Sequence, residues 1–182
     1  MKAPAPAVRV LAGRWKGRRL EAGSAARPTS ARARAALFSI LGERVAGARV
    51  LDLYAGTGAV GIEAVSRGAA AAVLVETDAA PVRRSIERIG GGGEFEVIAR
   101  PAGRALGDLA RRGERFDVVF ADPPYASGAE REELDAAARL LSPGGLLVLQ
   151  QDARVPAPPI EGARLLERRA YGRNVFLFFG MR

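Results

Sequence analysis

From residue 48 onward, short apolar segments alternate with segments of helical periodicity. The apolar segments are bounded by turn residues and are short, so they predict strands, and the segments between them predict helices. The predicted strands cover residues 49–54, 71–76, 94–98, 116–121, 145–150, 163–171 and 174–180, and the predicted helices cover 59–67, 81–89, 102–112 and 129–141. This alternation favours a mostly parallel sheet that is buried beneath helices on both faces.

The last two predicted strands have no helix between them and are joined through Gly172 and Arg173. Strands connected in this way pair antiparallel, which places a hairpin at one edge of the sheet. A Rossmann-like α/β fold with a mostly parallel seven-stranded sheet that ends in an antiparallel hairpin is typical of class I S-adenosylmethionine-dependent methyltransferases. We therefore expect that fold here, and not the commoner dinucleotide-binding form.

The N-terminal part of the chain predicts a small hairpin and helix extension to this sheet. Residues 7–12 alternate like a strand and lead into a hairpin, and Thr29 or Ser30 can cap the helix that follows. We accordingly divide the chain into a basic N-terminal arm at residues 1–29 and a methyltransferase domain at residues 30–182.

The composition excludes several kinds of chemistry, because the chain has no cysteine and no histidine. A disulfide framework, a zinc site built from Cys and His, and a Cys or His catalyst are all impossible. Methylation of a nucleic acid at a ring carbon usually needs a cysteine nucleophile, so that reaction class is disfavoured. Carboxylates, backbone groups, arginines and aromatic side chains remain to do the chemistry.

The formal net charge of +8 comes almost entirely from arginine. A GC-rich genome would raise the arginine content everywhere, but the basic residues cluster near the N-terminus, where Glu21 is the only acid among the first 34 residues. Besides Lys2, the cluster comprises Arg9, Arg14, Lys16, Arg18, Arg19, Arg27, Arg32 and Arg34. Such a local surplus of positive charge suits a polyanionic partner.

A glycine-rich segment follows the first predicted strand. Gly56, Gly58 and Gly61 fit the pattern G-x-G-x-x-G between a strand and a helix, which NAD, FAD and S-adenosylmethionine sites share. Glycines allow the backbone to approach a ligand, and the helix N-terminus offers free N–H groups. Glu76 ends the second predicted strand, where its carboxylate can accept hydrogen bonds from ribose hydroxyls, a group that NAD also has.

Asp52 distinguishes between these cofactors. It lies four residues before Gly56 on the first predicted strand. A carboxylate beside the loop suits a cofactor with an ammonium and a sulfonium group, and it would repel a pyrophosphate. Hydrogen bonding to turn amides is the alternative role for Asp52. The pattern favours S-adenosylmethionine.

The segment Asp122-Pro123-Pro124-Tyr125 follows a buried strand at the carboxyl edge of the predicted sheet, where open α/β folds bind ligands. The lone pair of an exocyclic base amine is delocalised into the ring, so this nitrogen is a poor nucleophile. The Asp122 carboxylate and the Pro123 carbonyl can accept its N–H bonds, which aims the nitrogen at the methyl group and disperses the developing positive charge. The prolines restrict the backbone, and Tyr125 can stack on an extruded base. These four residues are the predicted catalytic site. The methyl group would pass to the nitrogen by direct displacement from the sulfonium, without a metal.

At these motifs the chain resembles the RsmD family of bacterial 16S ribosomal RNA guanine-N2 methyltransferases over nearly its whole length. The matching segments are Arg9 to Gly13 with Gly17 and Arg18, Arg27 to Thr29 with Arg32, Arg34, Leu37 and Phe38, Leu51 to Glu63 with Ser66 to Ala69, Val75 with Glu76, Asp122 to Tyr125, and Tyr171 with Gly172. The Arg-Pro-Thr block at residues 27–29 is the most specific of these, because generic methyltransferases lack it.

The resemblance implies that residues 27–34 lie over the active site and contact cofactor and RNA. The implied RNA-binding residues are Arg14, Lys16, Arg18, Arg19, Arg27, Thr29, Arg32 and Arg34. A solvated helix face is the other interpretation of these arginines. The implied partner is 16S ribosomal RNA within the small ribosomal subunit, and we expect a monomer. The chain has no apolar run as long as a membrane span and no secretory signal at its start, so we expect a cytoplasmic protein.

Two positions depart from the expected patterns. Ala35 stands where the family often has Glu, and residues 98–103 lack the Asp that many methyltransferases place after the third strand to bond the adenine amine. Adenine recognition should then rely on backbone groups near Arg100, Pro101 and Ala102. The predicted cofactor site comprises Asp52, Tyr54, Ala55, Gly56, Thr57, Gly58, Gly61, Glu76, Thr77, Arg100, Pro101, Ala102 and Asp122.

Three other functions remain open at this point. A methyltransferase of the same fold could act on adenine-N6 of nucleic acid or on a protein glutamine, because these acceptors are also planar nitrogens. An NAD-dependent oxidoreductase would use the glycine loop and Glu76, although Asp52, the Asp-Pro-Pro-Tyr segment and the final hairpin argue against it. A non-catalytic RNA-binding module would need only the arginines.

Overall fold

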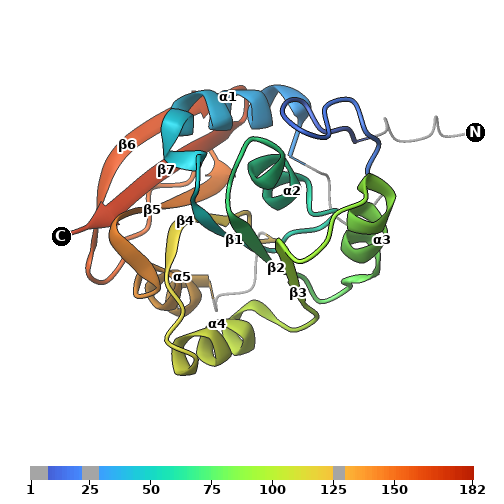
Figure 1. The fold of residues 1–182 in the computed structure, drawn as a ribbon. Coiled ribbons are helices and arrows are strands. Elements are labelled where there is room, and N and C mark those ends of the chain that lie inside the picture. The colour runs from blue at the N-terminus through green and yellow to red at the C-terminus, as the bar shows by residue number, and fades with distance from the viewer. Residues whose placement is uncertain (1–7, 22–28, 125–129) are drawn as a thin grey trace, which may run out of the picture.

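The fold is that of a computed structural model, which describes residues 8–21, 29–124 and 130–182. Its seven strands form a single sheet in the order β3-β2-β1-β4-β5-β7-β6 (Figure 1). The strands are β1 Arg49–Leu53, β2 Ala71–Val75, β3 Phe95–Ile98, β4 Phe116–Ala121, β5 Leu141–Asp152, β6 Ala163–Tyr171 and β7 Asn174–Met181. β1 to β5 pair parallel, and β7 pairs antiparallel with both β5 and β6. The predicted sheet with its edge hairpin is confirmed.

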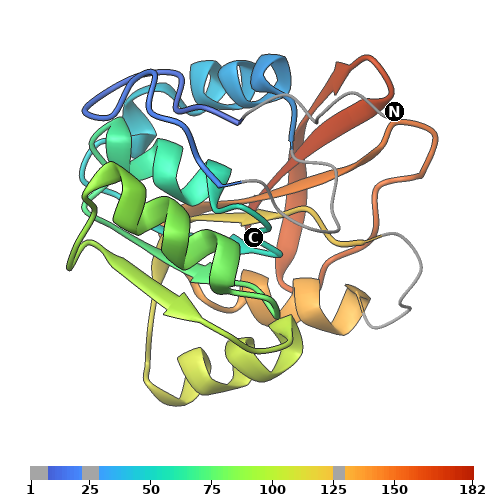
Figure 2. The ribbon, with the colours of Figure 1, turned by 90° about the vertical axis from the view of Figure 1, so that its right-hand side faces the viewer.

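Helices cover both faces of the sheet, as expected for buried parallel strands (Figures 1 and 2). The helices are α1 Ala31–Leu41, the 3₁₀ helix η1 Gly42–Val45, α2 Ala59–Ser66, α3 Ala80–Ile89, α4 Ala102–Arg111 and α5 Glu130–Ala138. Alternate strand residues supply the two hydrophobic cores: Phe120 packs with α1, α2 and α3, whereas Val119 packs with α4 and α5. None of the described helices has the length and apolar character needed to cross a bilayer.

The strand order reverses between β1 and β4, which are adjacent in the sheet. From β1 the chain proceeds to β2 and β3 on one side, and from β4 it proceeds to β5 on the other. A crevice forms at such a switch point beyond the carboxyl ends of the strands, and ligands of open α/β sheets bind there. The fold therefore places the loop after β1 beside the segment after β4.

The N-terminal arm differs from the predicted regular strand. The only bridge formed by its described residues pairs Arg9 with Arg19, supported by a hydrogen bond from the Val10 N–H to the Arg18 carbonyl at 3.0 Å. The ladder stops there because the next two N–H groups, of Leu11 and Ala12, donate to a side chain of α2. The arm's apolar residues Val10, Trp15 and Leu20 are buried in the same core as α1 and α2.

The structure selects one of the two predicted helix caps and moves the boundary between a helix and a strand. Ser30, and not Thr29, caps α1, since its hydroxyl accepts the Ala33 N–H at 3.1 Å. The helix predicted over residues 129–141 ends at Ala138, and β5 begins at Leu141 because Leu141 already pairs with Phe116 before the register shifts.

Candidate functional site

The loop between β1 and α2 is built by backbone that turns sharply. Gly56 has φ +58°, and Tyr54 has φ +60°, the only positive φ among the described residues other than glycine. Gly61 lies in the first turn of α2, where a Cβ would come within 2.9 Å of the Leu74 side chain. The glycines thus allow α2 to pack directly on β2 and leave the N–H groups of the loop close to the carboxyl edge of the sheet.

Asp52 lies beneath this loop and is 2% exposed. Its Oδ2 accepts the Gly61 N–H at 2.8 Å, so the side chain does bond a turn amide. Burial, opposed by the Gly61 N–H bond and aided by the nearby carboxylates of Asp122 and Glu76, raises the pKa of Asp52 to about 7. A cation placed among these three carboxylates would stabilise their ionised forms, which suits an ammonium or sulfonium and disfavours a phosphate.

Glu76 ties the end of β2 to the glycine loop, since its Oε2 accepts the Gly56 N–H at 2.8 Å. It also lines a cavity of about 230 Å³ at the carboxyl edge of the sheet. The cavity residues are Tyr54, Val75, Glu76, Thr77, Arg100, Pro101, Ala102, Pro124 and Glu133. Seven of these nine belong to the predicted cofactor or catalytic sets, and they come from four separate segments of the chain.

The remaining predicted cofactor residues do not line the cavity. They lie on β1, in the loop after it or in the first turn of α2, except for Asp122, which follows β4. They are Asp52, Ala55, Gly56, Thr57, Gly58, Gly61 and Asp122. Thr57 is 5% exposed, and its hydroxyl has no hydrogen-bond partner among the described residues. A buried hydroxyl without a partner is costly, so a ligand that bonds it would be stabilised. The donor set fits a nucleoside cofactor with a cationic tail.

Asp122 follows β4 and is held in place by two side chains. Its Oδ2 accepts the Gln150 Nε2–H at 2.9 Å and the Thr29 hydroxyl at 3.4 Å. Burial raises the pKa of Asp122 to about 6, while the bond from Thr29 lowers it. Pro123 is buried, Pro124 lines the cavity, and Tyr125 lies outside the described residues. The fixed carboxylate can therefore accept an N–H from a substrate at the same edge as the cavity.

Gln150 was not predicted from the sequence. It ends the apolar run of β5, is 5% exposed, and its Oε1 has no partner among the described residues. A buried amide at the carboxyl end of an apolar strand is itself a signal, because such a group needs a hydrogen-bond partner. Its contact with Asp122 could have been predicted only if the parallel pairing of β4 and β5 had been known.

Glu133 is the second residue that the sequence analysis missed. It lies on α5, and its carboxylate accepts the Gly103 N–H at 2.9 Å and a hydrogen bond from the Tyr54 hydroxyl. In the sequence it is one of several acidic residues of a charged helix, so no local pattern sets it apart. Only the packing of α5 against α4 brings it to the cavity.

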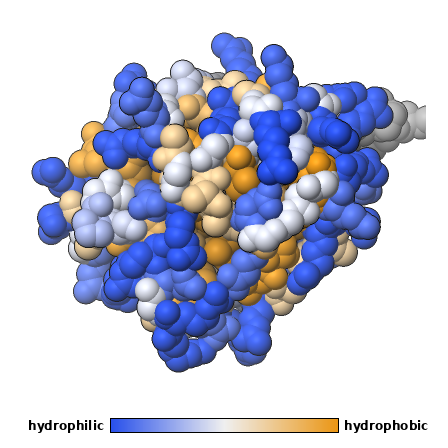
Figure 3. Space-filling model, viewed as in Figure 1, coloured by the Kyte–Doolittle hydropathy of each residue, from blue (hydrophilic) through white to orange (hydrophobic). Residues whose placement is uncertain are grey.

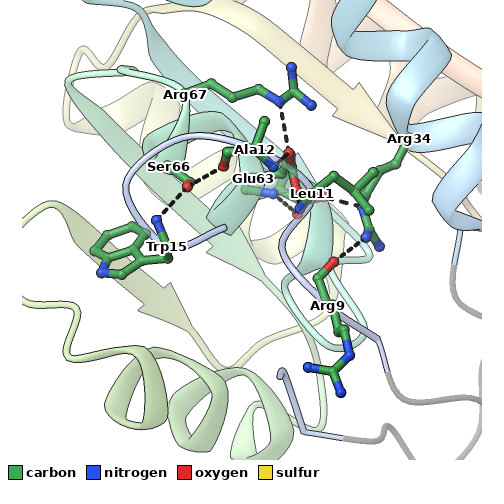
Figure 4. Close-up of polar contacts among 10 residues, drawn as sticks. Arg9, Leu11, Ala12, Trp15, Arg34, Glu63, Ser66 and Arg67 are labelled. Carbon is green, nitrogen blue, oxygen red and sulfur yellow. Dashed lines mark hydrogen bonds and ion pairs between the residues drawn. The ribbon is translucent and has the colours of Figure 1, made fainter. Parts of the chain in front are cut away.

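The expectation that Arg34 contacts RNA is wrong. Its side chain is 2% exposed, and its guanidinium donates to the Arg9 carbonyl at 2.5 Å and lies 4.0 Å from Glu63 (Figure 4). Burial lowers the pKa of Arg34, and the carboxylate of Glu63 raises it. The sequence pattern could not separate it from the exposed arginines, because α1 has its basic residues on both of its faces.

Glu63 is the centre of this buried cluster and is fully inaccessible to solvent. Its two oxygens accept the Leu11 N–H at 2.7 Å, the Ala12 N–H at 3.0 Å and the Arg67 Nε–H at 2.7 Å (Figure 4). The cluster therefore fastens the N-terminal arm to α2 through the backbone of the arm, and Arg34 joins α1 to the same point.

Hydrophilic side chains predominate on the face of the molecule shown in Figure 3. The other described basic residues that were predicted to bind RNA lie on the surface. Lys16, Arg18, Arg19 and Arg32 are exposed, and Arg27 lies outside the described residues. Arg14 is also exposed, but it pairs with Glu94 at 3.1 Å and lies over the Trp15 ring. The arm thus presents exposed cations on a backbone that the Glu63 cluster holds in place.

Comparison with known proteins gives consistent matches. The family described as conserved hypothetical protein 95 matches residues 8–180. Ribosomal RNA small subunit methyltransferase D of Escherichia coli (strain K12) is 36% identical over 132 residues, a match that spans 70% of this chain and 65% of that protein. The chain thus covers less than two thirds of the length of that relative.

Two further proteins match over nearly their whole length. YlbH of Bacillus subtilis (strain 168) is 33% identical over 177 residues, which is 91% of this chain and 94% of YlbH. The structure of a hypothetical protein of Thermus thermophilus superposes with a TM-score of 0.82 at 40% identity, covering 96% of this chain and 99% of that one.

Proposed function

The chain belongs to the RsmD family, described as conserved hypothetical protein 95, and we propose that it transfers a methyl group from S-adenosylmethionine to the exocyclic N2 amine of a guanine in 16S ribosomal RNA. The observation that supports this most strongly is the meeting of two predicted sites at one edge of the sheet. Six of the predicted cofactor residues line a cavity there, and the catalytic segment contributes Pro124 to the same wall.

The residues of the site have distinct roles in this reaction. S-adenosylmethionine supplies a methyl group that is activated by its sulfonium. Glu76 accepts hydrogen bonds from the ribose, and Asp52 provides negative charge near the amino-acid part. Asp122 and the Pro123 carbonyl accept the N–H bonds of the target amine, so that the nitrogen lone pair points away from them. The methylated amine is strongly acidic until it loses a proton, and the Asp122 carboxylate, whose pKa burial raises to about 6, can accept that proton and pass it to solvent.

The exposed cations of the arm supply the RNA-binding surface in this proposal. Thr29, which directly precedes the N-cap residue of α1, lies next to the catalytic carboxylate of Asp122. Contacts of Lys16, Arg18, Arg19 and Arg32 with phosphates would then position an extruded base near that carboxylate. The substrate in our proposal is RNA within the small ribosomal subunit, bound by a cytoplasmic monomer.

The acceptor atom is what separates this proposal from its nearest alternatives. The N6 amine of adenine and the side-chain amide of a protein glutamine also have planar nitrogens, and the same carboxylate could hold either of them. Nucleoside analysis of RNA after transfer of a labelled methyl group tests the choice: labelled N6-methyladenosine, or label found only in protein, would exclude guanine-N2.

Binding of S-adenosylhomocysteine should weaken as the pH falls below about 7. Burial raises the pKa of Asp52 to about 7 in the ligand-free protein, so below that pH its carboxyl must release a proton before it can interact with the ammonium of the ligand. The affinity should be constant well above this pH and fall by up to about tenfold per pH unit below it.

Calorimetry between pH 5.5 and 8.5, about 1.5 units on either side of 7, measures this dependence through the affinity and through the proton release in buffers of different ionisation enthalpy. The matched control is 5′-methylthioadenosine, which lacks the ammonium and should bind without the dependence. An equal pH dependence for both ligands would remove Asp52 from the amino-acid part. Tight binding of a nicotinamide nucleotide instead would reverse the assignment of the cofactor.

Replacing Lys16, Arg18 and Arg19 together with alanine should weaken RNA binding without changing the affinity for S-adenosylhomocysteine. Three lost phosphate contacts should reduce the slope of log affinity against log salt by about 2 for single-stranded RNA. Filter binding at several salt concentrations measures the slope. The control removes the same charge from Arg104, Arg111 and Arg115, which belong to the face covered by α4. Equal slopes for the two triple variants would contradict a specific role for the arm.

A further inference from the structure

We infer that the Glu133 carboxylate accepts a hydrogen bond from the exocyclic amine of the cofactor's adenine. Helix α5 would then supply the carboxylate that is absent after β3. The inference rests on the function proposed above, because it assigns a residue to one part of the proposed cofactor. It replaces the expectation that backbone groups alone recognise the base.

The segment between β3 and α4 offers no side-chain acceptor for an adenine amine. Residues 98–103 include no acidic or amide side chain, and Pro101, the N-cap residue of α4, makes no side-chain cap hydrogen bond. The same segment nevertheless forms one wall of the cavity through Arg100, Pro101 and Ala102. An acceptor must therefore come from another element.

Glu133 provides that acceptor from the neighbouring helix. α4 and α5 lie side by side on the same face of the sheet (Figures 1 and 2). The Glu133 carboxylate reaches Gly103, and a Cβ at position 103 would come within 3.1 Å of its Oε1. The lack of a side chain at Gly103 therefore leaves room for the carboxylate beside the first turn of α4, where the Gly103 N–H holds it.

The two carboxylates of the cavity have different surroundings. Glu76, to which the ribose is assigned in the proposed function, accepts the Gly56 N–H of the glycine loop. Glu133 instead accepts hydrogen bonds from the start of α4 and from Tyr54. Each carboxylate oxygen can accept more than one hydrogen bond, so the bonds that Glu133 already accepts fix its position without exhausting its capacity. Its negative charge favours a donor such as the adenine amine and repels a carbonyl oxygen in the same place.

A purely structural role makes a different prediction. Glu133 also supplies a negative charge and an acceptor at the N-terminus of α4, which stabilises that helix. If that were its whole role, its removal would weaken the binding of every nucleoside ligand by the same factor. Discrimination between an amine and a carbonyl at position 6 of the purine is therefore the readout that separates the two roles.

The experiment compares S-adenosylhomocysteine with S-inosylhomocysteine, in which a carbonyl replaces the amine, by calorimetry on the full chain. The unaltered protein should bind the adenine form at least about tenfold more tightly, as expected for a hydrogen bond to a charged group. In Glu133→Gln the ratio should fall toward one, because the glutamine amide can either accept or donate. Glutamine also keeps an acceptor for the Gly103 N–H, which preserves the fold, and the ratio is measured within one variant.

The matched control is Glu132→Gln, which removes the same charge from the adjacent exposed residue and should keep the full ratio. An undiminished ratio in Glu133→Gln, or a ratio near one in the unaltered protein, would overturn the inference while leaving the proposed function intact. If the unaltered protein bound neither ligand, the cofactor assignment itself would fail, and the inference with it.

Discussion

Replacing Asp122 with alanine is expected to lower the rate of methyl transfer by at least about a hundredfold, the scale of removing a positioned group that stabilises developing charge. The carboxylate is anchored by Gln150 and Thr29, so it is preorganised for the amine before substrate arrives. The affinity for S-adenosylhomocysteine should change by less than about threefold, because the loop, Glu76 and the cavity wall stay in place.

Single-turnover transfer of a labelled methyl group, together with calorimetry, separates the two effects. The matched control is Asp117→Ala, which removes a carboxylate from the opposite end of the same strand. An Asp122→Ala variant that retained normal transfer would leave the positioning of the amine to the Pro123 carbonyl alone. A large loss of cofactor affinity would instead show that Asp122 acts chiefly in cofactor binding, the other role predicted for it.

Replacing Glu63 with alanine is expected to lower the free energy of unfolding by about 3–5 kcal/mol, the cost of breaking a buried ion pair by removing one partner. The substitution leaves the guanidinium of Arg34 without its carboxylate in the interior and leaves the N–H groups of Leu11 and Ala12 without an acceptor. The arm should also detach more readily from α2, because those two bonds fasten its backbone there.

Thermal unfolding should show a midpoint lower by roughly 6–20 °C for a chain of this size. Glu87→Ala is the control, because it removes an exposed glutamate from the neighbouring helix α3. Limited proteolysis reports on the arm, where cleavage should be faster in Glu63→Ala than in the control. Equal unfolding midpoints for the two variants would show that the cluster contributes no net stability.

The sheet could be predicted from the sequence because its strands have an unambiguous pattern. Segments such as Ala71–Val75 are apolar throughout, as expected of strands buried on both faces, and glycine or proline lies near most strand ends. The N-terminal arm was harder to predict, because its alternating residues suggested a regular ladder. The buried Glu63 competes for the N–H groups of Leu11 and Ala12, and this competition depends on tertiary contacts.

The candidate site could be predicted where its residues follow strand ends directly. Asp52, Glu76 and Asp122 each have a fixed relation to a strand, and parallel strands bring their carboxyl ends together. Gln150 and Glu133 escaped prediction because their roles depend on which strands and helices are neighbours. Arg34 was misassigned for the related reason that helix periodicity does not reveal which charged side chain meets a buried partner.

The most direct test of the central claim is transfer of a labelled methyl group from S-adenosylmethionine to small ribosomal subunits that lack this modification, followed by nucleoside analysis. We predict labelled N2-methylguanosine at a single site of the 16S RNA, with transfer by Asp122→Ala at least about a hundredfold slower. Labelled N6-methyladenosine, label confined to protein, or no transfer by a protein that binds S-adenosylmethionine would contradict the claim.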